Sequence, residues 1–115
     1  MKIYHNPRCR KSRETLQILL DNNIELDIID YLKTPLTKKE LKNILKILGI
    51  SAKDLVRKGE QVFKDLYKGK DFSEEEYISI LSLHPILIER PIVVKDNRAV
   101  LGRPPINVLD LLDEK

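Results

Sequence analysis

Apolar and polar positions alternate near the start of the chain, and this pattern predicts two strands separated by a helix. Residues 2–5 and residues 24–31 alternate as half-buried strands do. Between them, residues 12–22 carry leucine and isoleucine on a helix that closes at Asn22-Asn23. Strand, short helix and strand form a βαβ unit, which requires a parallel strand pair and a right-handed crossover.

In the middle of the chain the period of the apolar positions changes from two to 3.6. Residues 37–40 and residues 73–76 are capping boxes, in which a hydroxyl residue and a glutamate three positions later satisfy each other's backbone N–H groups. The remaining helix boundaries in this part of the chain are Gly49, Ser51 and His84-Pro85. We therefore expect residues 37–88 to form an all-helical segment.

From residue 91 onward the chain returns to strands. Residues 91–94 and residues 99–101 flank an Asp96-Asn97 turn and predict a hairpin, and residues 105–112 predict a final helix with proline in its first turn. A βαβ unit, helices and a ββα unit in this order indicate an α/β fold with a mixed sheet of about four strands and helices on both faces. This arrangement is typical of the thioredoxin-like fold. We expect one domain over residues 1–115, with the all-helical segment as an insertion.

Composition limits the class of protein. The chain is 42% hydrophobic and 34% charged, as soluble globular domains are, and no apolar run approaches the ~18 residues of a membrane span. No secretory signal pattern is present. A single cysteine without an export signal points to a reducing, cytoplasmic location, and we expect a monomer. The net charge of +3 suits a small anionic substrate and is too weak to indicate nucleic acid.

Cys9 is the only cysteine, and it falls between the first strand and the first helix. The unpaired N–H groups and the positive dipole at a helix N-terminus stabilise an anion. Cations crowd the same segment: Arg8, Arg10, Lys11 and Arg13. Such an environment lowers the pKa of a thiol from ~8.5 into the range ~3.5–7.5 and produces a nucleophilic thiolate. The alternative is that Cys9 is a small buried hydrophobic residue.

Three arginines are candidates for an oxyanion site around this thiol. If the hairpin lies beside the first strand, Arg90 comes close to Cys9, and the Arg90-Pro91 bond at the strand entry is a candidate cis peptide. Arg103 follows the second hairpin strand and could reach the same edge, and Arg57 ends the short helix after residue 51. Guanidinium groups bind the oxygens of a tetrahedral oxyanion bidentately, while a thiolate attacks its central atom.

Each of these residues also has an explanation without chemistry. Arg57 could lie on a solvated helix face, Arg90 could pair with Glu89, and Arg103 could be an exposed turn residue without a function. His5, four residues before the thiol, could tune its pKa or shuttle a proton, or could simply bond to backbone. The functional interpretation requires that the side chains of these arginines and of His5 lie close to the thiol in the folded protein.

Spacing excludes some reactions. The phosphatase loop Cys-x5-Arg is absent, and Ser12 occupies the second position of a Cys-x-x-Cys dithiol centre. Ser12 could instead donate to the thiolate or cap the first helix. His5, Cys9 and His84 are too sparse for a metal site, so we expect none. Because the chain has no resolving thiol, an external thiol must complete any redox cycle.

Residues 4–16, 84–94 and 102–105, taken together and in this order, resemble the glutaredoxin-dependent arsenate reductase (ArsC) family. The resemblance covers nearly the whole chain and implies a thioredoxin-like fold with a helical insertion. It also implies that Cys9 attacks arsenate. The residues that match the family's oxyanion-binding arginines are Arg57, Arg90 and Arg103. His5 matches a histidine that influences the thiol, and Pro91 matches a cis proline.

The same resemblance implies the partners of the reaction. Glutathione and glutaredoxin would act as external thiols that complete the reduction of arsenate to arsenite, with no tightly bound cofactor. Two features depart from the best-studied arsenate reductases: Arg8, Arg10 and Lys11 make the thiol loop more basic, and residues 102–105 look more like those of ArsC-like relatives.

Two other functions remain open in the same superfamily. Spx-type regulators bind the RNA polymerase α-subunit and carry no arsenate chemistry. They typically have Cys-x-x-Cys and lack an Arg-Pro step after the hairpin, so Ser12 and Arg103-Pro104 count against that interpretation. A glutathione-dependent thiol reductase without an oxyanion substrate is the third possibility.

Overall fold

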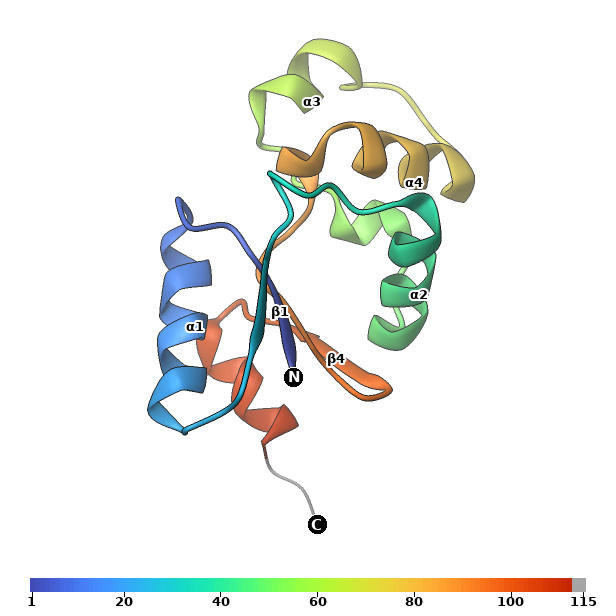
Figure 1. Ribbon diagram of the computed structural model, residues 1–115. Coiled ribbons are helices and arrows are strands. Elements are labelled where there is room, and N and C mark those ends of the chain that lie inside the picture. The colour runs from blue at the N-terminus through green and yellow to red at the C-terminus, as the bar shows by residue number, and fades with distance from the viewer. Residues whose placement is uncertain (113–115) are drawn as a thin grey trace. The chain divides into compact units, whose positions relative to one another are not determined.

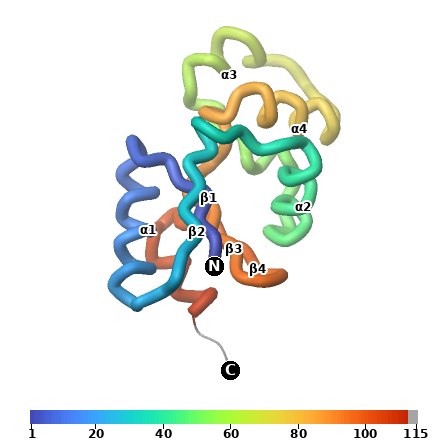
Figure 2. The backbone as a smooth tube through the Cα atoms, in the orientation of Figure 1, coloured from blue at the N-terminus to red at the C-terminus, as the bar shows by residue number. Residues whose placement is uncertain are grey.

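The strands at the two ends of the chain pair into one mixed sheet, as the pattern predicted (Figures 1 and 2). The strand order is β2-β1-β3-β4. The strands are β1 (Lys2–His5), β2 (Asp27–Asp30), β3 (Ile92–Lys95) and β4 (Arg98–Leu101). β1 runs parallel to β2 and antiparallel to β3, and β3 and β4 form the predicted hairpin. The βαβ unit and the hairpin therefore join through the central pair β1 and β3.

A computed structural model describes residues 1–112, and the chain divides into two units. Met1–Thr34 and the described residues from Arg90 onward form the sheet unit, and Pro35–Glu89 form the helical unit. Each unit has its own buried apolar side chains. None of the helices in the described part of the chain has the length and apolar character that crossing a membrane requires.

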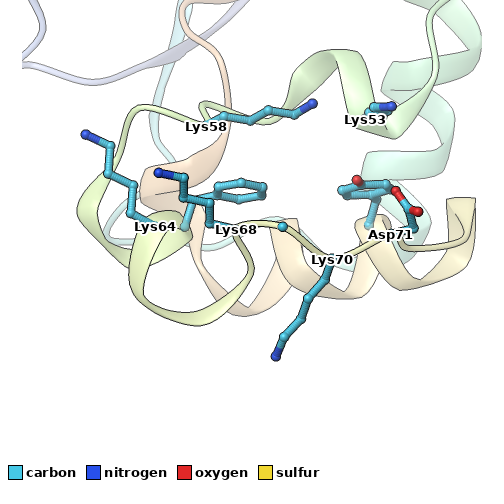
Figure 3. A pocket seen from close by; sticks show the side chains of 9 residues that line it. Lys53, Lys58, Lys64, Lys68, Lys70 and Asp71 are labelled. Atoms are coloured by element: carbon cyan, nitrogen blue, oxygen red, sulfur yellow. The ribbon is translucent and has the colours of Figure 1, made fainter.

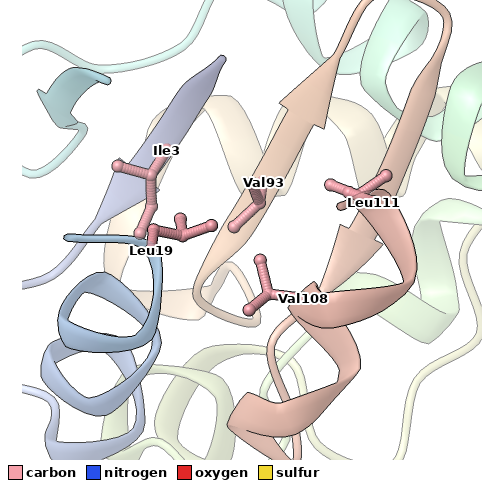
Figure 4. Close-up of a cluster of buried hydrophobic side chains, with 5 residues drawn as sticks. All are labelled: Ile3, Leu19, Val93, Val108 and Leu111. Atoms are coloured by element: carbon pink, nitrogen blue, oxygen red, sulfur yellow. The ribbon is translucent and has the colours of Figure 1, made fainter. Parts of the chain in front are cut away.

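In the sheet unit, α1 (Arg10–Asp21) and η3 (Pro105–Leu111) pack against each other on the same face of the sheet (Figure 4). The cluster between them and the strands consists of nearly fully buried side chains: Ile3, Leu19, Val93, Val108 and Leu111. Burying one such side chain is worth about 1.5–3 kcal/mol relative to leaving it exposed. This cluster fixes α1, and with it the N-terminus of α1, against the sheet.

Three elements of the sheet unit differ from the predicted ones. α1 begins at Arg10 rather than at Ser12, because Cys9 is its N-cap residue. β2 is four residues long instead of eight, because β1 offers it only the four partners Lys2–His5. The final helix has 3-10 rather than α geometry.

The helical unit contains α2 (Lys38–Leu48), η1 (Ala52–Leu55), α3 (Gln61–Leu66), α4 (Glu74–Leu83) and η2 (Pro85–Leu87). Both predicted capping boxes are present. The N–H of Glu40 donates to Thr37 Oγ1 and the N–H of Thr37 donates to Glu40 Oε1, each at 3.1 Å. Ser73 and Glu76 form the same pair of bonds at the start of α4. α2 ends at Gly49, as expected.

Two features of the helical unit were not predicted. α3 has six residues and a single buried side chain, Phe63, so it carries almost no periodic signal. An isolated antiparallel bridge joins Val56 to Ile88, and the N–H of Arg57 donates to the carbonyl of Leu87 at 2.7 Å. The segment is therefore not purely helical, because strand-like hydrogen bonds join its middle, at Val56 and Arg57, to its C-terminal end.

Candidate active site

Cys9 lies where β1 has ended and α1 begins. The loop after His5 is closed by a hydrogen bond from the Cys9 N–H to the carbonyl of Asn6 at 3.0 Å. The carbonyl of Cys9 then accepts the N–H of Arg13 at 3.0 Å, which is the first hydrogen bond of the helix. The partly exposed thiol therefore occupies the N-cap position of a 12-residue helix, as the sequence predicted.

The pKa of the Cys9 thiol is lower than that of an ordinary thiol. Burial by itself would raise this pKa, but hydrogen bonds outweigh it: from the backbone N–H of Ser12, from the side chain of Arg90 and from the backbone N–H of Lys11. The positive charge of Arg90 lowers the pKa further. As a thiol, Cys9 makes no conventional capping bond. The backbone donors therefore matter for the thiolate, which they stabilise as a helix N-terminus stabilises any anion.

The cation that acts on Cys9 comes from a distant part of the sequence and not from the loop. Arg10 is exposed and forms an ion pair with Glu14 at 2.9 Å, and Arg13 donates to the carbonyl of Pro7 at 3.0 Å. Arg90, in contrast, is only 6% exposed and reaches the thiol with its side chain. The expectation that the cations adjacent in sequence lower the pKa is therefore wrong in this respect.

His5 and Ser12 form a buried hydrogen-bonded pair beneath the thiol loop. His5 Nδ1 lies 2.6 Å from Ser12 Oγ, and the N–H of Asn6 donates to the same Ser12 oxygen at 3.0 Å. The Ser12 hydroxyl thus holds the loop that carries Cys9, and it does not cap the helix. The alternative in which His5 bonds only to backbone is also wrong, because its partner is a side chain.

The pKa of His5 is lowered, so the ring is neutral at pH 7. Burial is the main cause, the nearby carboxylate of Asp30 opposes it, and the charge of Arg13 adds to it. A neutral ring can accept a hydrogen bond from the Ser12 hydroxyl at Nδ1 and keep its own proton on Nε2. The pair therefore contributes shape and hydrogen bonds to the loop rather than a second positive charge.

Two Arg-Pro steps bracket the hairpin. The Arg90-Pro91 peptide bond is cis, which confirms the prediction, and the Arg103-Pro104 bond is also cis, which was not predicted. Arg103 Nη1 donates to the carbonyl oxygen of Arg90 at 3.3 Å. Arg103 therefore lies against the backbone of the residue whose side chain reaches the thiol.

Gly102 allows this close approach, and sequence reasoning missed it. A Cβ atom at this position would lie 2.5 Å from Thr15 Oγ1 and 2.8 Å from Pro91 Cγ. The N–H of Gly102 donates to the carbonyl of Pro91 at 2.9 Å. Only glycine lets the end of β4 pass this near to α1 and the cis proline. The signal in the sequence was a lone glycine immediately before the second Arg-Pro step.

Arg57 belongs to the helical unit. Its Nε lies 3.5 Å from Glu60 Oε1 and 3.5 Å from Glu89 Oε1. Its Nη1 is buried and has no hydrogen-bond partner among the described residues. Glu89 thus forms an ion pair with Arg57, and the alternative pairing of Glu89 with Arg90 stays a prediction. The role of Arg57 at the thiol stays a prediction.

The sheet unit therefore brings Cys9, His5, Ser12 and Arg90 together, with Arg103 held on the backbone of Arg90. This arrangement combines a thiol that ionises easily with buried guanidinium charge, and that combination can hold and attack an anion. Among the described residues, no group of three His, Cys, Asp or Glu side chains is arranged to hold a metal ion.

Comparisons with known proteins show the family of the chain. The ArsC family model matches residues 4–111. The chain is 46% identical over 114 residues to uncharacterized protein YfgD of Escherichia coli K12, covering 97% of this chain and 96% of that protein. It is 42% identical over 112 residues to an arsenate reductase of Haemophilus influenzae, and the match covers 96% of this chain and 97% of that protein.

A solved structure gives the same result. Arsenate reductase from Vibrio cholerae superposes with a TM-score of 0.90 at 41% identity, over 96% of this chain and 97% of that chain. The predicted α/β, thioredoxin-like fold is thus confirmed. The chain belongs to the ArsC family.

Proposed function

We propose that this protein is an arsenate reductase in which Cys9 is the single nucleophile. The observation that carries the proposal is the hydrogen bond from the Arg90 side chain to Cys9, which helps to lower the pKa of this thiol, in a chain of the ArsC family. Curated relatives at about 41–42% identity over nearly the whole chain are named arsenate reductases. A thiolate with a neighbouring guanidinium is the pairing that attack on a tetrahedral oxyanion requires.

The reaction balances with two external thiols. The Cys9 thiolate attacks the arsenic(V) atom and displaces one oxygen, which leaves as water after protonation, so that a Cys–S–As(V) adduct forms. A first external thiol then adds to arsenic in exchange for a second oxygen. When the sulfur–sulfur bond forms between Cys9 and this thiol, both arsenic–sulfur bonds break and one of their electron pairs stays on arsenic, which reduces arsenic(V) to arsenic(III). One water molecule then adds back to arsenic, so that arsenite is released. Reduction of the mixed disulfide by the second thiol restores Cys9, so that arsenate and two thiols yield arsenite, one disulfide and water.

The arginines would hold the oxyanion through these steps. The Arg90 side chain stabilises the thiolate before the attack and is near enough to bind an oxygen of the bound arsenate. Arg103, held on the Arg90 carbonyl, would bind a second oxygen. Arg57 would supply the third guanidinium. His5 and Ser12 would keep the thiol loop in its reactive shape through their 2.6 Å contact.

We propose glutathione and glutaredoxin as the external thiols. Cys9 is the only cysteine, so no second thiol of the chain can resolve the mixed disulfide. No tightly bound cofactor is needed, because the electrons come from the thiols. The requirement for reduced thiols fits a cytoplasmic location.

Arsenate turnover with glutathione and glutaredoxin tests the proposal, with wild type compared to Cys9→Ser. We expect the wild type to release arsenite and Cys9→Ser to lose the activity, because a hydroxyl is not ionised at neutral pH. Ser51→Ala, a change at an exposed serine of the helical unit, is the control and should keep full activity. Arsenite release by Cys9→Ser would contradict the proposal.

Two further assays identify the alternatives. Reduction of a small disulfide without any arsenate turnover would show a thiol reductase instead. Binding to the RNA polymerase α-subunit without either activity would show a regulator.

A further inference from the structure

A pocket in the helical unit is surrounded by lysines and is unrelated to the thiol (Figure 3). Its volume is about 330 Å³, which lies at the lower end of the range for small-molecule sites. Five of the residues that line it are exposed lysines: Lys53, Lys58, Lys64, Lys68 and Lys70. Phe63 and Tyr77, both buried, form its apolar part. The pocket is therefore an apolar hollow with a cationic rim.

The rim concentrates the positive charge of the protein. The five lysines and Asp71, the one acidic residue of the lining, carry a net charge of +4, whereas the whole chain carries +3. The rest of the chain is therefore slightly negative. Gathering like charges on one rim costs free energy unless an anion neutralises them.

None of the five rim lysines forms an ion pair with a carboxylate of the described residues. Other cations of the chain do form ion pairs: Lys42 with Glu75, and Arg57 with Glu60 and Glu89. Among the side-chain ammonium groups of the five rim lysines, only that of Lys70 has a hydrogen-bond partner within the described residues, the carbonyl oxygen of Leu66 at 3.4 Å. The acidic residues nearby in sequence are engaged elsewhere, since Asp54 accepts from Ser51 and Asp65 accepts from Gln61.

The aromatic side chains of the pocket floor contact one another. Phe63 and Tyr77 belong to a cluster of rings in which Tyr67 lies 6.1 Å from Phe63 and 5.6 Å from Phe72, and Phe72 lies 5.4 Å from Tyr77. Tyr67 is held in turn by a hydrogen bond between its hydroxyl and His84 Nε2 at 2.9 Å. A pocket that is already formed loses less freedom when a ligand binds.

The backbone brings the rim lysines together. The N–H of Lys68 donates to the carbonyl of Phe63 at 3.0 Å, which closes the end of α3. Gly69 then adopts a φ of 78°, a conformation that glycine allows and that turns the chain between Lys68 and Lys70. In Figure 3 the ammonium group of Lys58 points toward Lys53, whereas those of Lys64 and Lys70 extend outward in two other directions. The positive charges are therefore spread over the rim, and such a rim suits an anion with several separated charges better than a single small ion.

From these observations we propose that this pocket binds a small organic molecule that carries two phosphate groups. Two phosphates bear roughly −3 to −4 at neutral pH, which matches the net charge of the lining. Lysines bind phosphate as point charges and need no fixed fork geometry, unlike arginines. The apolar floor accommodates the organic part of the ligand. This site is separate from the proposed arsenate chemistry and does not depend on it.

Titration of the full chain with ADP, followed by amide NMR shifts, tests the proposal. We expect saturable 1:1 binding with the largest shifts in residues 58–71. Pyrophosphate should bind more weakly, because it has no organic part, and adenosine should not bind, because it has no charge. Binding should weaken as the ionic strength rises. Largest shifts in residues 6–13, binding of adenosine as tight as that of ADP, or pyrophosphate binding as tight as that of ADP would each overturn the proposal.

Charge variants give the second test. Lys64→Gln with Lys68→Gln should raise the Kd for ADP about tenfold or more, because two charge-assisted hydrogen bonds are lost. Lys64→Arg with Lys68→Arg keeps the charges and should bind ADP nearly as wild type does. Lys38→Gln with Lys39→Gln removes the same charge from exposed positions of the same unit and is the matched control. An equal loss of binding in the control pair would show non-specific attraction and overturn the proposal.

Discussion

The thiol loop of the sheet unit and the lysine pocket of the helical unit both use positive charge, but in opposite ways. At the thiol, the almost fully buried Arg90 acts on Cys9 at hydrogen-bonding distance. At the pocket, five exposed lysines surround an apolar floor without ion pairs among the described residues. A buried cation acts strongly on one atom because water does not screen it. Exposed cations are screened individually and act together on a larger anion.

The two regions also differ in how sequence relates to effect. Around Cys9, the side chains of Arg10 and Arg13 bond to other partners, and the arginine that acts on the thiol lies about eighty positions away. In the pocket, four of the five lysines fall between residues 58 and 70. Burial and fold therefore select the cation at the thiol, whereas local sequence alone supplies most of the pocket.

The largest expected effect comes from Arg90→Ala. Without its guanidinium, the thiolate loses a hydrogen bond and a positive charge, so the pKa of Cys9 should rise. Arsenate turnover should fall by ~10²–10³, as it does when one oxyanion donor is removed. The rate of alkylation of Cys9 against pH measures the pKa.

Arg10→Ala is the matched control, because it removes an exposed arginine next to Cys9 in sequence. It should leave the pKa and the turnover nearly unchanged. If Arg10→Ala raises the pKa as much as Arg90→Ala does, the distinction between buried and adjacent cations fails.

Gly102→Ala should lower the free energy of unfolding by about 1–3 kcal/mol, because the new methyl group has no space beside Thr15 and Pro91. Urea unfolding measures this change. Gly59→Ala, where no atom lies within 4 Å of the added Cβ, should stay within about 0.5 kcal/mol of wild type. Equal effects of the two substitutions would contradict the close packing at Gly102.

In the helical unit, Thr37→Ala should lower the free energy of unfolding by about 1 kcal/mol, because the Glu40 N–H loses its hydroxyl acceptor. Thr37→Ser keeps the hydroxyl and should cost much less. Urea unfolding compares the three proteins. A Thr37→Ala protein as stable as wild type would show that the capping box contributes nothing measurable.

The smallest effect is a pH dependence of stability from the partly exposed Cys9. A thiol whose pKa is lowered by folding stabilises the folded state when the pH lies above the unfolded value of ~8.5, and this contribution is lost as the pH falls through the folded pKa. The free energy of unfolding of wild type relative to Cys9→Ser should therefore increase with pH up to about 8.5 and then level off. A difference that does not change with pH would show that the thiol ionises equally in both states.

Local signals in the sequence determined most of the elements. The capping boxes at Thr37 and Ser73 and the Asp96-Asn97 turn are short-range hydrogen-bonding patterns, and the structure contains all three. The position of Cys9 at a helix N-terminus follows from the same kind of local reasoning. Two elements were not predicted correctly from local signals. α3 was missed because it has only one buried side chain, and β2 was predicted too long because its length depends on the four residues of β1 that can pair with it.

Only the tertiary structure decided which side chains act on the thiol. Composition and spacing marked Arg90 and Arg103 as candidates, but they could not show that Arg90 reaches Cys9 while Arg10 turns to Glu14. They also gave no reason for a glycine at position 102, whose need arises from a close approach of three separate segments. The physical reason is the same in each case. Burial and long-range contact are properties of segments that meet only after folding, whereas caps and turns are complete within a few consecutive residues.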